Sequence, residues 1–274
     1  MVDEPRVHSI PVRGGRMEAL TLRGGDATPL VVLGGVETAL RHLAGTEAML
    51  QQRWRRRRRA RTVVVLGRPL AARPEDTASL AHPRHIAEAV AGAMEGLGGA
   101  ASIEAESGGG RIALWLASER PELVDRLVLS SVASETPPEM AGALGRWIDM
   151  AEAARWGELF GHLAVVMRPE GSVHAAAVSV AARATRAPAT PERFIGELRA
   201  TLDPSSFVTD RLPQIRAPTL VLAGGRDRVV PPDTTHAVAM GIPGARFEIA
   251  PACGHTVRSS FTGYDDLVEA FLAG

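Results

Sequence analysis

The sequence predicts an α/β protein in which a mostly parallel central sheet is covered by helices on both faces. Two observations lead to this fold class. Short apolar runs, such as PLVVL at 29–33 and TVVVL at 62–66, have the length and composition of strands buried on both faces. Segments with helical spacing of apolar residues alternate with these runs, as a parallel sheet with crossover helices requires.

The first 131 residues supply most of the expected sheet. Residues 6–23 are predicted to form two strands around a turn at Gly14-Gly15, because paired glycines between apolar runs are typical of hairpins. Glycines Gly98-Gly99 are placed to end a helix. The other expected elements of this part are strands at 29–33, 62–66, 102–106 and 127–131, and helices at 38–59, 82–97 and 109–118.

The alternation stops after residue 131 and resumes near residue 205. The segment between has helical periodicity and no convincing strand, and its ends are marked by Pro137-Pro138 and Asp203-Pro204. We therefore predict a core made of residues 1–131 and 205–274, and a helical cap at 132–204. The core elements expected in the second part are strands at 218–223 and 246–250, and helices at 234–240 and 264–272.

Charge and composition exclude some classes of function. The chain has 31 basic and 31 acidic residues, and this balance argues against a nucleic-acid binder, which needs a basic surplus. A run of five arginines, 55–59, is interpreted as a solvated helix end, where cations complement the helix dipole, rather than as an anion-binding patch.

Cysteine content and hydrophobic runs bear on location. A single cysteine allows no internal disulfide and no multi-thiolate zinc site, which favours a reducing compartment. No apolar run approaches the ~20 residues of a membrane span, and the first ten residues lack the apolar core of a secretory signal. We expect a cytoplasmic protein with no membrane partner, and the oligomeric state is left open.

The segment 102–118, SIEAESGGGRIALWLAS, carries the strongest chemical signal. It places Ser107 between a strand and a helix, on a sharp turn that exposes the hydroxyl above the sheet. Such a turn needs small neighbours, here Ala105 and Gly109. The backbone N–H of Gly108 starts the helix, where it can bind a developing oxyanion.

From this point the sequence resembles the α/β-hydrolase superfamily. The resemblance rests on AESGGGRIALWLASERPELVDRLVLSS at 105–131, above all on Arg120-Pro121-Glu122-Leu123-Val124 and the strand after it. Residues 217–232, APTLVLAGGRDRVVPP, resemble the acid-bearing segment of that family, and Cys253-Gly254-His255 resembles its histidine loop. The order Ser, Asp, His along the chain is the one that this fold uses.

The resemblance implies a role for each residue. Ser107 would be the nucleophile, activated by His255 as general base. Asp227 would hold the imidazole tautomer and stabilise the imidazolium. Backbone N–H groups would form the oxyanion hole, and the expected donors are Gly108 and, from the loop after Leu33, Val36 or Gly35.

The chain also departs from the family pattern. Gly34-Gly35 stands where the family often has His-Gly, and no Asp-x-x-Gly follows Leu66. Glu37 and Glu106 place carboxylates near the expected oxyanion, and we expect both to point away into polar contacts. Glu104 is unexpected in a strand that is normally apolar.

The resemblance implies a cofactor-free serine enzyme acting on an ester, thioester, lactone or similar acyl group, and we expect this function. A phosphate-binding loop would need a lysine, which the sequence lacks, and no histidine, cysteine and aspartate cluster has metal-ligand spacing. Bulky cap residues are predicted to bind an apolar or aromatic small molecule, with packing of the cap onto the core as the alternative: Trp147, Met150, Trp156 and Phe160.

Two other functions are kept. The same site could serve natural-product biosynthesis in secondary metabolism, in a non-hydrolytic step such as cyclisation or carbon–carbon bond formation. A catalytically dead ligand-binding protein is the second alternative, because a fold does not by itself fix a function.

Overall fold

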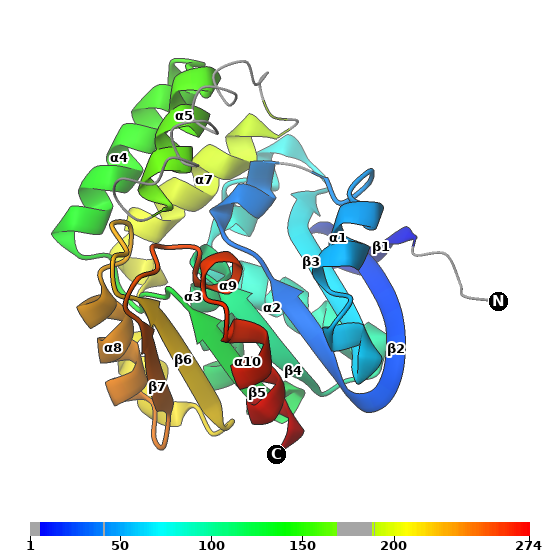
Figure 1. Ribbon diagram of the computed structural model, residues 1–274. Helices are drawn as coiled ribbons and strands as arrows, with labels where there is room; N and C mark the ends of the chain where they lie inside the picture. Colours follow the sequence, from blue (N-terminus) through cyan, green and yellow to red (C-terminus); the bar gives the residue numbers. More distant parts are fainter. Residues whose placement is uncertain (1–5, 41, 169–187, 189) are drawn as a thin grey trace.

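The computed structural model describes residues 6–40, 42–168, 188 and 190–274 (Figure 1). Its centre is a mostly parallel sheet whose strands follow the sequence-based expectation closely. The strands are β1 (Val7–Val12), β2 (Gly15–Leu33), β3 (Arg61–Ala71), β4 (Ala101–Glu106), β5 (Val124–Ser130), β6 (Thr219–Gly224) and β7 (Arg246–Ala250).

The long strand β2 organises one half of the sheet. Its first part pairs antiparallel with β1 and β3, whereas in its last part Leu30–Leu33 are in register with Val63–Leu66 of β3 and with Ser102–Ala105 of β4. Irregular pairing between Leu22 and Leu30 joins the two parts, which the sequence predicted as separate strands. Strands β4 to β7 continue in parallel, so their carboxyl ends lie at one edge of the sheet.

Helices cover both faces of this sheet. In Figure 1, α10 and α9 lie in front of the strands and α2 and α3 lie behind them. Apolar clusters fill the space on each side, and none of the helices formed by the described residues is long and apolar enough to span a membrane. The helices are α1 (Glu47–Arg53), α2 (Pro83–Leu97), α3 (Gly108–Glu119), α8 (Pro232–Gly241), α9 (Val257–Ser260) and α10 (Tyr264–Ala273).

Three further helices stand together beyond the sheet, at the upper left of Figure 1. They are α4 (Pro138–Glu152), α5 (Trp156–Val166) and α7 (Pro191–Leu202). Ala154, in the turn between α4 and α5, has a positive φ of 55°. Part of the predicted cap, residues 169–187 and 189, lies outside the described residues, and the division at 132 and 204 stays a prediction.

The helix expected at 38–59 is wrong as a single element. The structure has a 3-10 turn η1 (Val36–Leu40), the short helix α1 and a second turn η2 (Arg57–Arg59). Gly45 separates η1 from α1 with φ 83°, a left-handed conformation that cannot continue a helix. Other 3-10 turns are η3 (Pro74–Asp76), η4 (Ser79–Ala81), η5 (Pro121–Leu123), η6 (Pro204–Ser206) and η7 (Thr209–Gln214).

The arginine run is also different from the expectation, because its central member is buried. Arg57 is 0% exposed, and its partners come from strand β4 and helix α10. Its guanidinium pairs with Glu104 at 3.2 Å, Asp265 at 3.2 Å and Glu269 at 2.9 Å. A buried cation needs such partners, so this part of the run docks the carboxyl-terminal helix instead of facing solvent.

Candidate active site

Ser107 occupies the turn between β4 and α3. Its φ is 54° and its ψ −124°, a conformation that residues other than glycine rarely adopt. The Ser107 N–H donates to the Ser130 carbonyl at 3.0 Å, and the Ser107 carbonyl accepts from the Gly110 N–H at 2.8 Å. The surrounding backbone therefore holds the strained turn, as strain at a functional site requires.

Gly109 shows why the turn needs small residues. A Cβ at this position would lie 2.3 Å from the Leu33 carbonyl oxygen and 2.4 Å from that of Gly34. The start of α3 thus packs directly onto the chain leaving β2. Ala105 lies on the preceding strand and is 1% exposed, so its methyl group is accommodated in the core.

The structure brings His255 and Asp227 to the same serine. His255 Nε2 lies 2.9 Å from Ser107 Oγ, and His255 Nδ1 lies 2.8 Å from Asp227 Oδ2. The other oxygen of Asp227 accepts from the N–H groups of Val229 and Val230 at 2.8 and 2.9 Å. Three segments that follow β4, β6 and β7 thus meet in one chain of hydrogen bonds.

The surroundings of His255 favour its charged form. The side chain is buried, and burial by itself lowers the pKa of an imidazole. Charge and hydrogen bonding from Asp227, with smaller contributions from Glu106 and Glu37, raise the pKa by more. The net result is a pKa above the ordinary 6.5, which suits a base that must hold a proton during a reaction.

The candidate oxyanion donors lie beside the serine. A Cβ on Gly35 would be 3.3 Å from Ser107 Cβ, and a Cβ on Gly108 would be 3.5 Å from the Val36 nitrogen. Gly108 is the first residue of α3 and Val36 the first of η1, so their N–H groups have no partner within their own helices. Gly35, Val36 and Gly108 therefore lie together next to Ser107, and the small volume beside them is the candidate oxyanion site.

Two carboxylates stand close to that volume. Glu106 lies 3.7 Å from Arg53, and burial together with nearby Glu37 raises its pKa. Glu37 does not point away as expected, because its carboxylate folds over Gly35, where a Cβ would be 2.4 Å from Glu37 Oε2. The site entrance is therefore acidic on one side.

Glu104, the unexpected residue of β4, is held by three partners. It is 4% exposed and accepts from Arg57 and Arg258 and from the Tyr264 hydroxyl. Burial would raise the pKa of Glu104, but the two guanidinium groups lower it by more. The sequence offered one signal for this cluster, because a carboxylate in an apolar strand requires a buried cation. The identity of the cations could not be read from it.

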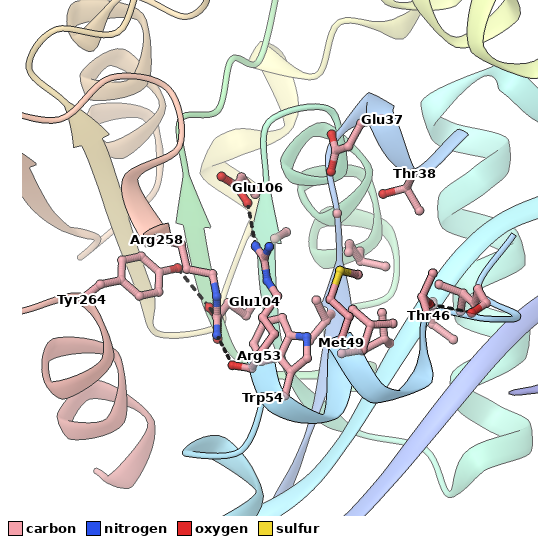
Figure 2. A pocket seen from close by; sticks show the side chains of 18 residues that line it. Glu37, Thr38, Thr46, Met49, Arg53, Trp54, Glu104, Glu106, Arg258 and Tyr264 are labelled. Carbon is pink, nitrogen blue, oxygen red and sulfur yellow. Dashed lines mark hydrogen bonds and ion pairs between the residues drawn. The ribbon is translucent and has the colours of Figure 1, made fainter. Parts of the chain in front are cut away.

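A pocket lies beside the elbow turn and is lined by Gly34, Ala105 and Glu106, whereas Ser107, His255 and Asp227 are not part of its lining (Figure 2). Apolar residues from β2, β3 and α1 form much of its wall, including Leu33, Leu66 and Leu50. Arg53 and Arg258 place positive charge near Glu104 and Glu106 on another side. Its mixed apolar and charged lining is typical of sites for small molecules.

The four predicted substrate residues of the cap do not line this pocket. Trp147 is 1% exposed and donates from Nε1 to His162 Nδ1 at 3.0 Å. Trp156 is 7% exposed and packs against Phe160 and Phe194. Met150 and Phe160 are only partly buried. The two tryptophans thus belong mainly to the packing of the helices.

Comparison with known proteins identifies the family of the chain. Residues 87–258 match the family model described as "Serine aminopeptidase, S33". The chain is 30% identical over 222 residues to 2-hydroxymuconate semialdehyde hydrolase of Pseudomonas putida, covering 76% of this chain and 75% of that protein.

Solved structures show the same fold. The enol-lactonase from Burkholderia xenovorans has a TM-score of 0.77 at 18% identity, covering 97% of this chain and all of that one. A thermophilic esterase from Thermogutta terrifontis also has a TM-score of 0.77, at 20% identity and 98% of both chains. The chain therefore belongs to the α/β-hydrolase superfamily, in the S33 serine aminopeptidase family, as an enzyme of the serine hydrolase type.

Proposed function

We propose that the protein hydrolyses an ester, thioester or lactone of an apolar small molecule through Ser107, His255 and Asp227. The observation that carries this proposal is the unbroken hydrogen-bond chain, 2.9 Å from Ser107 to His255 and 2.8 Å from His255 to Asp227. A serine hydroxyl is a weak nucleophile unless a base removes its proton, and this chain supplies the base and the group that orients it.

The reaction follows from these positions. His255 Nε2 takes the hydroxyl proton as Ser107 Oγ attacks the acyl carbon, and Asp227 stabilises the resulting imidazolium. The negative oxygen of the tetrahedral intermediate accepts hydrogen bonds from the N–H of Gly108 and from that of Val36 or Gly35. His255 then protonates the leaving group, and a water activated by the same imidazole hydrolyses the acyl-enzyme.

The pocket supports an apolar acyl or alcohol group with a polar end. Its leucine wall would bury the apolar part, and Arg53 could hold a carboxylate or carbonyl oxygen near the entrance. Met150 and Phe160, which are only partly buried, are the better candidates for substrate contacts from the cap. Trp147 and Trp156 would act through the packing of α4 and α5.

Hydrolysis of 2-hydroxymuconate semialdehyde or of a similar compound is a second candidate. It is favoured by the 30% identity to a protein named 2-hydroxymuconate semialdehyde hydrolase. Incubation with 2-hydroxymuconate semialdehyde and with a series of p-nitrophenyl esters would separate the two reactions. The non-hydrolytic tailoring step stays a prediction without a structural observation in its favour. The inactive binding protein is set aside, because the family match and the relative indicate an enzyme of the serine hydrolase type.

The deciding experiment is covalent labelling with a fluorophosphonate probe, together with p-nitrophenyl ester hydrolysis. The wild-type protein should be labelled and active, and Ser107→Ala should lose both properties. Ser9→Ala, an exposed serine on the edge strand β1, is the matched control and should keep both. An unlabelled wild-type protein, or labelling that persists in Ser107→Ala, would contradict the proposal.

A further inference from the structure

A buried arginine outside the predicted site contacts the loop that carries the candidate oxyanion donors. Arg68 lies near the carboxyl end of β3 and is 2% exposed. Its Nη2 donates to the carbonyl oxygens of Gly34 and Gly35 at 3.0 and 3.1 Å. Its Nε donates to Glu197 of α7 at 2.8 Å.

The direction of these carbonyls fixes the direction of the N–H groups. In a planar trans peptide the C=O and N–H bonds point in opposite directions. The Gly34 carbonyl shares a peptide with the Gly35 N–H, and the Gly35 carbonyl shares one with the Val36 N–H. With both carbonyls bound to Arg68, both N–H groups are turned away from it.

The strand order determines where those N–H groups then point. Leu30–Leu33 of β2 pair with β3 on one side and with β4 on the other. Arg68 belongs to β3, whereas Ser107 follows β4. The N–H groups that point away from Arg68 therefore lie on the side of Ser107, and Gly35 is next to this residue, since a Cβ on Gly35 would be 3.3 Å from Ser107 Cβ.

We propose that Arg68 is a positioning residue that sets the peptide orientation of the oxyanion hole, and that Glu197 couples this orientation to helix α7. The inference rests on the proposed acyl chemistry. Without Arg68, the Gly35 carbonyl would keep the Thr38 N–H at 3.0 Å as a partner. The Gly34 carbonyl would lose its hydrogen bond from Arg68, and the orientation of the Gly34–Gly35 peptide would no longer be fixed by that bond.

The coupling to α7 has a second contact. Arg193, four residues before Glu197 and on the same helix face, donates to the carbonyls of Ala39 and Arg68 at 3.0 and 3.5 Å. Helix α7 is therefore hydrogen-bonded both to Arg68 and to the turn η1 that follows the oxyanion loop. A displacement of α7 would reach the oxyanion donors through these two side chains.

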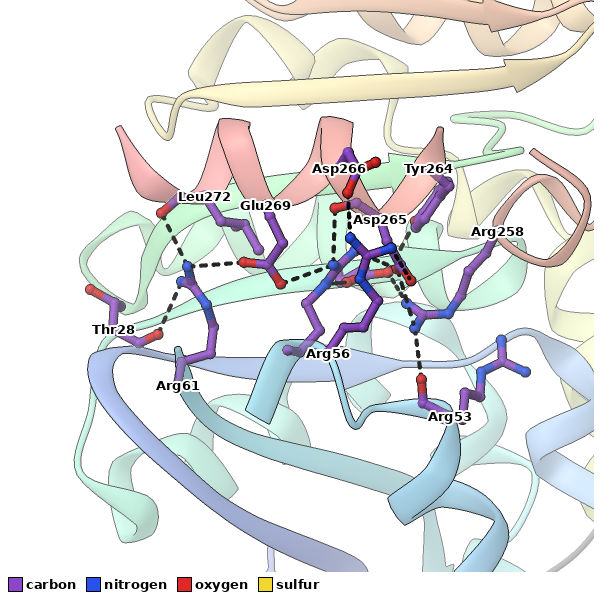
Figure 3. Close-up of polar contacts among 12 residues, drawn as sticks. Thr28, Arg53, Arg56, Arg61, Arg258, Tyr264, Asp265, Asp266, Glu269 and Leu272 are labelled. Atoms are coloured by element: carbon purple, nitrogen blue, oxygen red, sulfur yellow. Dashed lines mark hydrogen bonds and ion pairs between the residues drawn. The ribbon is translucent and has the colours of Figure 1, made fainter. Parts of the chain in front are cut away.

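The test compares Arg68→Lys with Arg61→Lys. Arg61 is a matched control, because it lies at the other end of β3, is 2% exposed, and contacts the carbonyls of Thr28 and Leu272 and the carboxylate of Glu269 (Figure 3). Lysine keeps the charge but cannot form the planar fork that reaches several acceptors. Both variants should lose thermal stability.

The expected result separates the two arginines by kinetics. Arg68→Lys should lower kcat for p-nitrophenyl butyrate by about 10²-fold, the usual cost of one oxyanion donor, with little change in KM. It should weaken inhibition by phenylboronic acid, whose serine adduct is tetrahedral, by a similar factor. Arg61→Lys should keep kcat and this inhibition.

The inference is overturned if Arg68→Lys keeps kcat within a few-fold, or if Arg61→Lys loses as much. Glu197→Gln provides the test where Arg68→Lys does not fold. It should lower kcat with KM unchanged, and an unchanged kcat in this variant also overturns the inference. Where Arg68→Lys does fold, Glu197→Gln should add nothing to its effect in the double variant. Failure of the proposed function itself is distinguishable, because the wild-type protein would then not be labelled by a fluorophosphonate.

Discussion

Buried arginines at the two ends of strand β3 make the same kinds of contact, to carboxylates and backbone carbonyls, but in different parts of the molecule. At its start, Arg61 and nearby Arg57 hold the carboxyl-terminal helix through carboxylates of that helix. Near its end, Arg68 binds two carbonyls beside Ser107 and a carboxylate of α7. Buried arginines therefore serve stability at one end and the geometry of a reaction at the other. Burial alone does not tell the two roles apart, since all three side chains are at most 2% exposed.

The largest change in activity is expected near the other end of β3, at Ser107. Ser107→Ala should lower kcat by about 10⁴-fold or more, because members of a catalytic triad act as a unit. The thermal midpoint should stay close to that of the wild type, since the hydroxyl is only partly buried. Parallel ester kinetics and thermal unfolding check this, and a large fall in the midpoint would show that the serine is also structural.

Near the start of β3 we expect a loss of stability with little change in activity. Arg57→Met removes one member of a buried ion-pair cluster and should lower the free energy of unfolding by about 3–5 kcal/mol. Ester kcat of the folded protein should change little. Urea unfolding and kinetics at low denaturant measure both, with Arg59→Met as an exposed control from the same run. If kcat fell although the variant was fully folded, the contacts of α10 would also contribute to catalysis.

The same contrast can be sharpened within the cap. Trp147→Ala should cost about 3–5 kcal/mol of stability, because it removes a large side chain that is 1% exposed. Phe160→Ala, on a partly buried residue, should instead change KM or chain-length preference among p-nitrophenyl esters. Kinetics and unfolding of both variants decide between packing and selectivity. Unchanged kinetics in Phe160→Ala would contradict a role of this cap residue in substrate recognition.

The smallest effect is a shift in pH dependence. The base must be neutral to accept a proton, so kcat/KM should fall as pH drops through the pKa of His255, which lies above 6.5. Glu106 helps to raise this pKa, so Glu106→Gln should lower it and move the acidic limb to lower pH. Glu158→Gln, an exposed residue of α5, is the control. A limb that moves upward would contradict the electrostatic argument.

The sequence was most informative where local pattern and chemistry coincide. The elbow around Ser107 was predictable, because a strand, a small-residue turn and a helix are all encoded within 102–118. The membership in the α/β-hydrolase superfamily is confirmed. The helix at 38–59 was wrong, because apolar spacing does not reveal that Gly45 adopts φ 83°. The catalytic roles of Ser107, His255 and Asp227 stay a proposal.

By itself the sequence determined the alternation of strands and helices, and with it the edge of the sheet where Ser107 stands. Only the tertiary structure decided which arginine meets which carboxylate. Glu104 and Arg258 are 154 positions apart, and Arg68 and Glu197 are 129 apart. The physical reason is that strand and helix periodicity is local, whereas the partner of a buried charge depends on segments that meet only after the chain has folded.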